Sequence, residues 1–228
     1  MPQNIKTIVL LASLNPVLYY IVLLEAYSLL PAQVAQSLNY TWAITLTILS
    51  VPILGHKLTR QDLFAIVMAY LGVVLISFSG KSITGEVSYF GIFLALVSPI
   101  IWAMYWLLNT RDTRPALIKL FQSFSLAVPI LIIITTIFEG IPKALHLKQI
   151  MGMVYIGLFE MGLAFMCWQM ALQLSDKVSK ISILIFLSPF ISLFIIHHVL
   201  GEPLHIMTFM GLGLIVFGIL VQQFKNKN

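Results

Sequence analysis

Polar and aromatic side chains that could bind a small molecule lie inside long apolar stretches of this sequence. Asn39, Tyr40, Thr41 and Trp42 form one such group, within an apolar stretch that runs from about residue 32 to 54. Buried against hydrocarbon, their amide and hydroxyl groups would lack partners, so they should face other helices or a water-filled cavity. Tyr and Trp combine an apolar face with one hydrogen-bonding group, which suits an amphiphilic ligand such as an amino acid. The alternative is hydrogen bonding that holds helices together.

Glu160 is a second candidate, because it is a carboxylate near the middle of an apolar stretch. An ionised acid at the centre of a bilayer costs a few kcal/mol, so it must be protonated, paired or hydrated. Such a group suits proton coupling or the binding of a substrate ammonium group. The alternative is a protonated Glu160 hydrogen-bonded to another helix, with Asn15 as its expected partner.

Trp102 and Tyr105 lie three residues apart, so on a helix they share one face. That face either lines a cavity or packs in an aromatic core, and Tyr105 could instead belong to an interfacial belt. Pro99, Pro129 and Pro189 lie well inside apolar stretches, as does Pro16, and each can kink its helix because proline removes a backbone donor. We expect the first three to act as hinges.

Small residues at helical spacing predict where helices pack closely. Gly91 and Ala95 form one such pair, and Gly211, Gly213 and Gly218 add small positions to the last apolar stretch. Small side chains let helix backbones approach within a membrane, so we expect all of these positions to serve packing.

Catalytic and metal-binding patterns are absent from the sequence. We find no HExxH, GxSxG or Walker A motif and no paired aspartates within apolar stretches. His197, His198 and His205 lack the spacing of metal ligands, and the single cysteine, Cys167, excludes a disulfide-stapled secreted domain. We therefore predict that the protein is not an enzyme, has no catalytic residue and needs no metal or cofactor.

The composition places the chain in a membrane. Of its 228 residues 60% are apolar and 9% charged, with a mean hydropathy of +1.00, whereas soluble domains carry about 25% charged residues. Apolar runs long enough to cross a bilayer as helices recur throughout. They predict an all-α, polytopic membrane helix bundle with eight spans, at residues 7–30, 32–54, 63–79, 89–109, 116–138, 149–172, 179–200 and 205–224. The short loops leave no room for a soluble domain.

The basic residues predict the orientation of these spans. Ten of the 13 Lys and Arg residues fall on the side of the N-terminus, namely Lys6, Lys57, Arg60, Arg111, Arg114, Lys119, Lys177, Lys180, Lys225 and Lys227. Only Lys81, Lys143 and Lys148 fall on the other side. The positive-inside rule then places both termini in the cytoplasm. The net charge of +5 faces anionic lipid, so no nucleic-acid partner is expected.

The first three spans resemble the last three when the chain is shifted along itself. The shift lays Leu54-Gly55 on Leu200-Gly201, Gly72 on Gly218 and, with one residue of slippage, Asn15 on Glu160. The two copies are five spans apart, an odd number, so they must have opposite orientations in the membrane. The basic loop at Lys57 and Arg60 accordingly has a copy, residues 201–205, without Lys or Arg. Inverted repeats of this kind are the architecture of many secondary transporters.

Three stretches resemble the EamA-type permeases of the drug/metabolite transporter superfamily. They are Leu38-Asn39-Tyr40-Thr41-Trp42 leading to Leu54-Gly55-His56-Lys57, then Ile101-Trp102-Ala103-Met104-Tyr105, and finally Leu187-Ser188-Pro189-Phe190 leading to Leu200-Gly201-Glu202. The resemblance implies ten helices in two inverted five-helix repeats around a central cavity. This chain matches helices three to ten, so residues 1–80 correspond to a truncated first repeat and residues 81–228 to the second.

The resemblance implies a secondary transporter of the bacterial inner membrane that exports small metabolites by alternating access, with amino acids as the first guess. By this resemblance Trp102 lines the cavity. Together with the side chains discussed above, it places the predicted substrate cavity at Asn39, Tyr40, Trp42, Trp102, Tyr105 and Ser188, and Glu160 and Asn15 remain the coupling candidates. The alternative is a truncated protein that does not transport, or one that depends on a homodimer or a partner chain to supply the missing helices.

Overall fold

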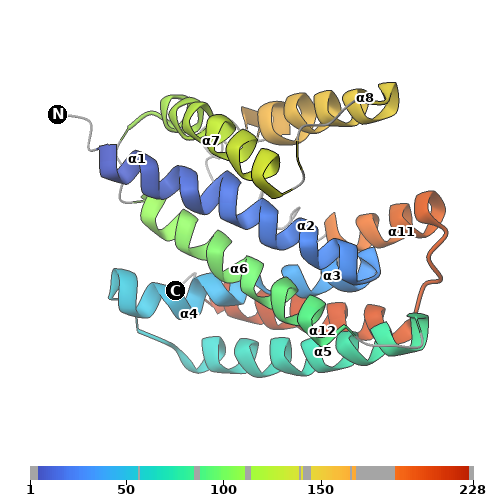
Figure 1. Ribbon diagram of the computed structural model, residues 1–228. Coiled ribbons are helices and arrows are strands. Elements are labelled where there is room, and N and C mark those ends of the chain that lie inside the picture. The colour runs from blue at the N-terminus through green and yellow to red at the C-terminus, as the bar shows by residue number, and fades with distance from the viewer. Residues whose placement is uncertain are drawn as a thin grey trace. The chain divides into compact units, whose positions relative to one another are not determined.

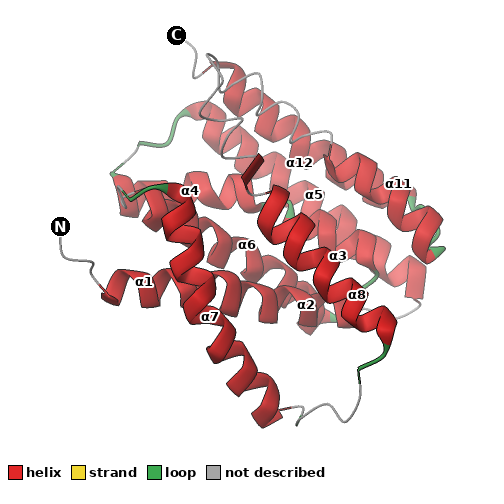
Figure 2. Ribbon diagram, turned by 90° about the horizontal axis from the view of Figure 1, so that it is seen from above, coloured by secondary structure: helices red, strands yellow, loops and turns green. Residues whose placement is uncertain are grey.

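The computed structural model describes residues 5–55, 57–84, 88–110, 114–138, 140, 145–164, 166–167 and 188–225. Helices make up the regular structure of these ranges, which contain no strand (Figure 2). The predicted all-α class is therefore confirmed for the described part of the chain. Contacts divide the chain into two compact units, one formed by Met1–Ala12 and Arg114–Ile185, the other by Ser13–Thr113 and Phe186–Asn228.

The smaller unit holds α1 (Ile5–Ala12), α7 (Ala116–Phe138), α8 (Leu147–Tyr155) and the π-helical segment η2 (Ile156–Ala164), labelled in Figure 1 except for η2. Helix α1 packs against α7, and η2 continues directly from α8. The predicted spans 116–138 and 149–172 are thus helical as far as they are described, and residues 165 and 168–172 of the latter lie outside the described residues.

The larger unit begins with a π-helical segment η1 (Ser13–Leu18) and α2 (Tyr19–Leu29). It continues with α3 (Ala32–Asn39), α4 (Trp42–Leu54), α5 (Arg60–Thr84) and α6 (Tyr89–Thr110), and ends with α11 (Ser188–Leu200) and α12 (Ile206–Lys225). Helix α6 packs against α2, α3 and α4. Residues 179–187 of the predicted span 179–200 lie outside the described residues.

The most extensive contact in this unit joins α5 and α12, which run side by side in Figures 1 and 2. Small residues allow their backbones to approach closely. A methyl group added at Gly72 would lie 2.5 Å from the carbonyl oxygen of Gly211, and one added at Gly218 would lie 3.0 Å from that of Ala65. Because the residue numbers rise on one helix as they fall on the other, the two helices are antiparallel.

A buried hydrogen bond reinforces this pair nearer the C-terminal end of α5. Thr208 Oγ1 donates to Ser79 Oγ at 2.8 Å, and Ser79 Oγ donates to the carbonyl oxygen of Ile76. Both hydroxyl-bearing side chains are fully buried. Hydroxyl groups in an apolar interface need such partners, so this bond fixes the register of α5 against α12.

The expectation that Gly211, Gly213 and Gly218 all serve close packing is correct for two of them. A methyl group added at Gly213 would meet no described residue within 4 Å. Gly213 lies two residues from Gly211, which on a helix turns it to another face. The predicted small pair Gly91 and Ala95 is buried in α6, where a methyl group at Gly91 would lie 2.8 Å from Leu30 Cγ.

The predicted span 32–54 is not one continuous helix. Helix α3 ends at Asn39 and α4 begins at Trp42, with Tyr40 and Thr41 forming a turn between them. The Thr41 amide donates to the Leu38 carbonyl at 3.1 Å, and the Thr41 hydroxyl donates to the same oxygen at 2.8 Å. A side chain that bonds the preceding turn competes with the helical ladder, which accounts for the break at this point.

Corresponding helix ends in the larger unit follow the shift found in the sequence. Helix α4 ends at Leu54 and α11 at Leu200, and each is followed by a glycine with positive φ, 75° at Gly55 and 69° at Gly201. Only glycine adopts this left-handed conformation readily, so both helices end in the same kind of cap. The next helices begin at Arg60 and Ile206, which keep the same separation in the chain.

The outer faces of these helices are strongly apolar. Val67, Tyr70 and Phe78 of α5 and Phe90 and Phe93 of α6 are each more than half exposed. Within the described residues three helical stretches are long and apolar enough to cross a membrane, namely Ile5–Leu29, Tyr89–Asn109 and Leu117–Phe138. Shorter apolar helices cover Ser188–Leu200 and Ile206–Val221. An apolar exterior of this extent is typical of a protein solvated by lipid.

The packing of α5 on α12 makes a prediction about stability. Gly72→Ala should destabilise the purified protein by about 1–3 kcal/mol, because the new methyl group forces the backbones apart. The matched control, Gly213→Ala, should leave stability unchanged or raise it slightly, since alanine favours the helix and its methyl group meets none of the described residues. Thermal unfolding in detergent measures both, and equal melting temperatures would contradict the close approach.

Candidate functional site

A kink brings Asn15 into the interior of the larger unit. Asn15 has extended dihedral angles, φ −143° and ψ 121°, inside η1 and directly before Pro16, which lacks the amide hydrogen needed to continue the helix. The Asn15 side chain is 4% exposed and is hydrogen-bonded to the hydroxyl of Tyr105. Its amide oxygen Oδ1 has no hydrogen-bond partner among the described residues. A buried acceptor is thus held among aromatic residues.

Asn39, the last residue of α3, links three helices. Its oxygen Oδ1 accepts a hydrogen bond from Ser98 Oγ of α6 at 2.9 Å, and its nitrogen Nδ2 donates to Tyr19 Oη of α2 at 3.2 Å. Ser98 is fully buried and Tyr19 is 7% exposed. Both groups of the amide are used, so the orientation of the Asn39 side chain is fixed.

Four aromatic rings pack together beside these amides. Tyr19 and Trp102 lie with ring centroids 4.7 Å apart, and Trp102 lies 6.2 Å from Tyr105 and 5.7 Å from Trp106. The predicted common face of Trp102 and Tyr105 is therefore observed. Tyr105 is 2% exposed, which places it inside the unit rather than in an interfacial belt. Trp102 is half-buried and so keeps part of its ring accessible.

Tyr40 and Ser188 connect the helix break to the C-terminal part of the chain. Their hydroxyl oxygens lie 3.3 Å apart, although the residues are 148 positions apart in sequence. Tyr40 is 8% exposed. Trp42, the first residue of α4, is half-buried, and among the described residues the ring contacts of the cluster do not include it.

The remaining predicted residues are distributed over both units. Glu160 lies in η2 of the smaller unit with its side chain exposed, so its expected pairing with Asn15 of the larger unit stays a prediction. Pro99 is buried within α6, Pro189 is buried at the second residue of α11, and Pro129 is exposed within α7. Their role as hinges also stays a prediction.

Tyr19 and Ser98 belong to this site and were not predicted from the sequence. Tyr19 lies four residues after Asn15, and Ser98 four residues before Trp102, so helical spacing relates each to a residue that was predicted. Searching for polar residues at that spacing would have found both.

Comparison with known protein families identifies the chain. The model of the EamA-like transporter family matches residues 1–78 and 89–222. This chain belongs to the EamA-like transporter family. The recognition of an EamA-type permease of the drug/metabolite transporter superfamily is thereby confirmed.

Similar proteins carry the same kind of name. An uncharacterized transporter in the sor 3' region of Acidianus ambivalens is 26% identical over 89% of this chain and 78% of its own length. An uncharacterized transporter of Clostridium kluyveri is 24% identical over 77% of this chain and 58% of its own length. For the uncharacterized transporter YvbV of Bacillus subtilis the identity is 25%, over 95% of this chain and 71% of its own length. The chain therefore spans only part of the length of each of these relatives.

A solved structure shares the fold of this EamA family member. It superposes with a TM-score of 0.65 at 19% sequence identity and covers 98% of this chain and 77% of the other. Together, the family and its transporter-named relatives support an integral membrane transporter rather than an enzyme. The cluster of buried amides and aromatic rings is then the candidate site for its substrate.

The bridge at Asn39 predicts an energetic coupling with Ser98. Asn39→Ala and Ser98→Ala should each destabilise the protein, and the double variant should lose about 0.5–1.5 kcal/mol less than their sum, because either change removes the same bond. Unfolding of the purified protein measures the cycle. Ser50→Ala serves as the control partner, since the Ser50 hydroxyl donates to the nearby Thr47 carbonyl of its own helix. A coupling no larger than that of the control pair would contradict the bridge.

Proposed function

We propose that this chain is a secondary transporter of a bacterial inner membrane that exports small amphiphilic metabolites from the cytoplasm. Its mechanism would be alternating access, and amino acids are the first substrate class to test. One observation carries the proposal. Two interrupted apolar segments, η1 and the α3–α4 break, meet the aromatic face of α6 in one unit of an EamA family member. Substrate sites of secondary transporters are typically built at interrupted helices.

The chemistry of the residues suits an amino acid. The Oδ1 atom of Asn15, which has no hydrogen-bond partner in the described part of the chain, can accept a hydrogen bond from a substrate ammonium group. The rings of Trp102 and Tyr19 offer faces for an apolar side chain or a cation. Such mixed surfaces with few polar groups are typical of small-molecule sites. We place Asn39, Tyr40, Trp42, Tyr105 and Ser188 around the same substrate.

The inverted repeat is supported by contacts between α5 and α12. The shift that lays Leu54 on Leu200 carries Gly72 onto Gly218 and Ala65 onto Gly211. It therefore converts the close contact of Gly72 with Gly211 into the close contact of Gly218 with Ala65. An exchange of this kind is expected where a two-fold pseudo-symmetry axis passes between two helices. We accordingly propose repeats at residues 1–80 and 81–228, corresponding to helices three to ten of a ten-helix transporter.

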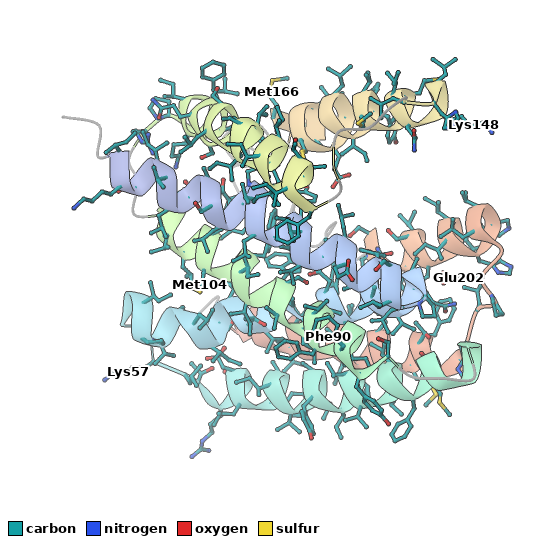
Figure 3. All side chains as sticks on the ribbon, viewed as in Figure 1. Lys57, Phe90, Met104, Lys148, Met166 and Glu202 are labelled. Atoms are coloured by element: carbon teal, nitrogen blue, oxygen red, sulfur yellow. The ribbon has the colours of Figure 1, made fainter. Side chains whose placement is uncertain are left out.

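The antiparallel course of α5 and α12 supports the proposed orientation. The loop that carries Lys57 precedes α5, which begins at Arg60, whereas the loop that carries Glu202 precedes α12. These loops therefore lie at opposite ends of the unit (Figure 3). With the basic loop in the cytoplasm, as the positive-inside rule requires, the Glu202 loop faces outward and both chain termini are cytoplasmic.

Replacing Trp102 distinguishes a substrate surface from a packing core. Trp102→Ala should lower amino acid efflux from loaded proteoliposomes by about fivefold, because substrate loses an aromatic face worth about 1 kcal/mol. Phe93→Ala, on the exposed face of the same helix, should leave efflux unchanged. The amount of protein in the membrane is measured in parallel. If Trp102→Ala lowers that amount as much as it lowers efflux, the residue serves packing.

Glu160 provides the test of proton coupling. Glu160→Gln should make efflux independent of pH, because glutamine cannot exchange a proton, whereas Glu25→Gln should keep the pH dependence of the parent protein. Efflux at a series of external pH values measures both. An unaltered pH profile in Glu160→Gln would exclude the coupling role.

A further inference from the structure

Helix α3 is a short segment held at its N-terminus by a distant carboxylate. The backbone amides of Ala32 and Gln33 donate to Glu202 Oε1 and Oε2, at 2.8 and 3.2 Å. Gln33 Nε2 donates to the carbonyl oxygen of Pro203 at 2.8 Å. Figure 3 labels Glu202 on the loop between α11 and α12, beside the end of α3. Three hydrogen bonds thus join α3 to this loop.

The loop that supplies Glu202 is itself fixed. The ring nitrogen Nδ1 of His197, in the last turn of α11, lies 2.7 Å from the backbone oxygen of Glu202. At the other end of α3, Tyr40 contacts Ser188 of α11. Helix α3 also packs against both α11 and α12. Its two ends are therefore bound to the same C-terminal part of the unit, while turns at Pro31 and Tyr40 separate it from α2 and α4.

The negative charge of Glu202 makes its hydrogen bonds to the amides of α3 stronger than the neutral bond between Gln33 and Pro203. The first amides of a helix have no partners within the helix and carry a partial positive charge, so a carboxylate is stabilised there. Hydrogen bonds to a charged acceptor are about twice as strong as neutral ones. Removal of the Glu202 carboxylate leaves the N-terminal amides of α3 without this acceptor.

Two buried polar atoms, by contrast, make the packed position of α3 less stable. Gln33 Oε1 and Ser37 Oγ are buried and have no hydrogen-bond partner among the described residues. Such atoms are costly where they are and are solvated readily once water reaches them. Because Gln33 and Ser37 are four residues apart, they lie on one face of α3. That face is suited to a segment that is alternately covered and wetted.

We propose that Glu202 is a latch that holds α3 closed against the α11–α12 loop, and that its release opens the end of the transporter opposite Lys57 and Arg60. This inference rests on the proposed transport function, in which that end faces outward. It assigns a gating role to α3 and distinguishes Glu202 from the residues that contact substrate.

Cysteine accessibility tests the latch without any substrate. In a Cys167→Ser background, which removes the single native cysteine, Ser37→Cys provides a buried reporter. A membrane-impermeant maleimide is added to whole cells and to inverted membrane vesicles. Glu202→Ala should raise the labelling rate of the reporter in whole cells roughly tenfold, because loss of a charged acceptor shifts a two-state equilibrium by that order. Labelling in inverted vesicles should not rise.

Control variants separate release of the latch from general loosening. Glu25→Ala removes an exposed carboxylate from α2 and should leave labelling unchanged. Glu202→Gln keeps one acceptor oxygen. Gln33→Leu removes the bond to Pro203 but also the buried oxygen Oε1, and it keeps the Glu202 carboxylate. Both variants should therefore give smaller rises than Glu202→Ala. If Glu202→Ala is absent from the membrane, the labelling rates of these two variants test the latch in its place.

Three results would overturn the latch: no rise in whole cells, an equal rise with Glu25→Ala, or a rise confined to inverted vesicles. Failure of amino acid efflux in the parent protein would instead contradict the proposed function. The labelling result stands independently of it, because labelling reports only the movement of α3.

Discussion

The close approach of α5 and α12 is the contact on which the larger unit depends. Lipid tails are as apolar as the helices, so burial of apolar surface drives helix association weakly within a membrane. Close contact between the helix backbones holds the pair together instead. Any side chain at Gly72 or Gly211 would prevent that contact. The register set there determines where the N-terminus of α12, and with it the Glu202 loop, meets the first half of the chain.

Around this rigid pair, the unit concentrates its polar groups where helices are interrupted. Asn15 lies at the kink in η1, and Asn39 precedes the break between α3 and α4. An uninterrupted helix satisfies its own backbone groups, whereas an interrupted one needs side chains or ligands as additional partners. The amides of Asn15 and Asn39 are such side chains. Ser98 and Tyr19 satisfy both groups of the Asn39 amide, whereas Asn15 bonds Tyr105 and keeps its Oδ1 without a partner among the described residues. In the proposed function, the residues at these helix interruptions are the ones that would also contact substrate.

Local patterns predicted the helices well and the distant contacts poorly. Each described helix overlaps a predicted apolar span, although the single span 32–54 contains both α3 and α4. The shift between the repeats reappears in the helix ends at Leu54 and Leu200. The break at Tyr40 was missed because hydropathy averages over a turn formed by a single Thr hydroxyl. The role of Glu202 had no local signal, since its partners lie 169 and 170 residues away. The buried position of Tyr105 could likewise not be read from the sequence alone.

The separation of Glu202 from its partners in the sequence has a consequence for the synthesis and assembly of the protein. Ala32 and Gln33 leave the ribosome about 170 residues before Glu202 does. At a synthesis rate of about 5–20 residues per second, that interval is roughly 10–30 s. During it, the N-terminal amides of α3 must be satisfied by water or lipid headgroups, which keeps this end of the segment near the membrane surface. Helix α3 therefore reaches its packed position among the last steps of assembly, after the loop between α11 and α12 has been synthesised.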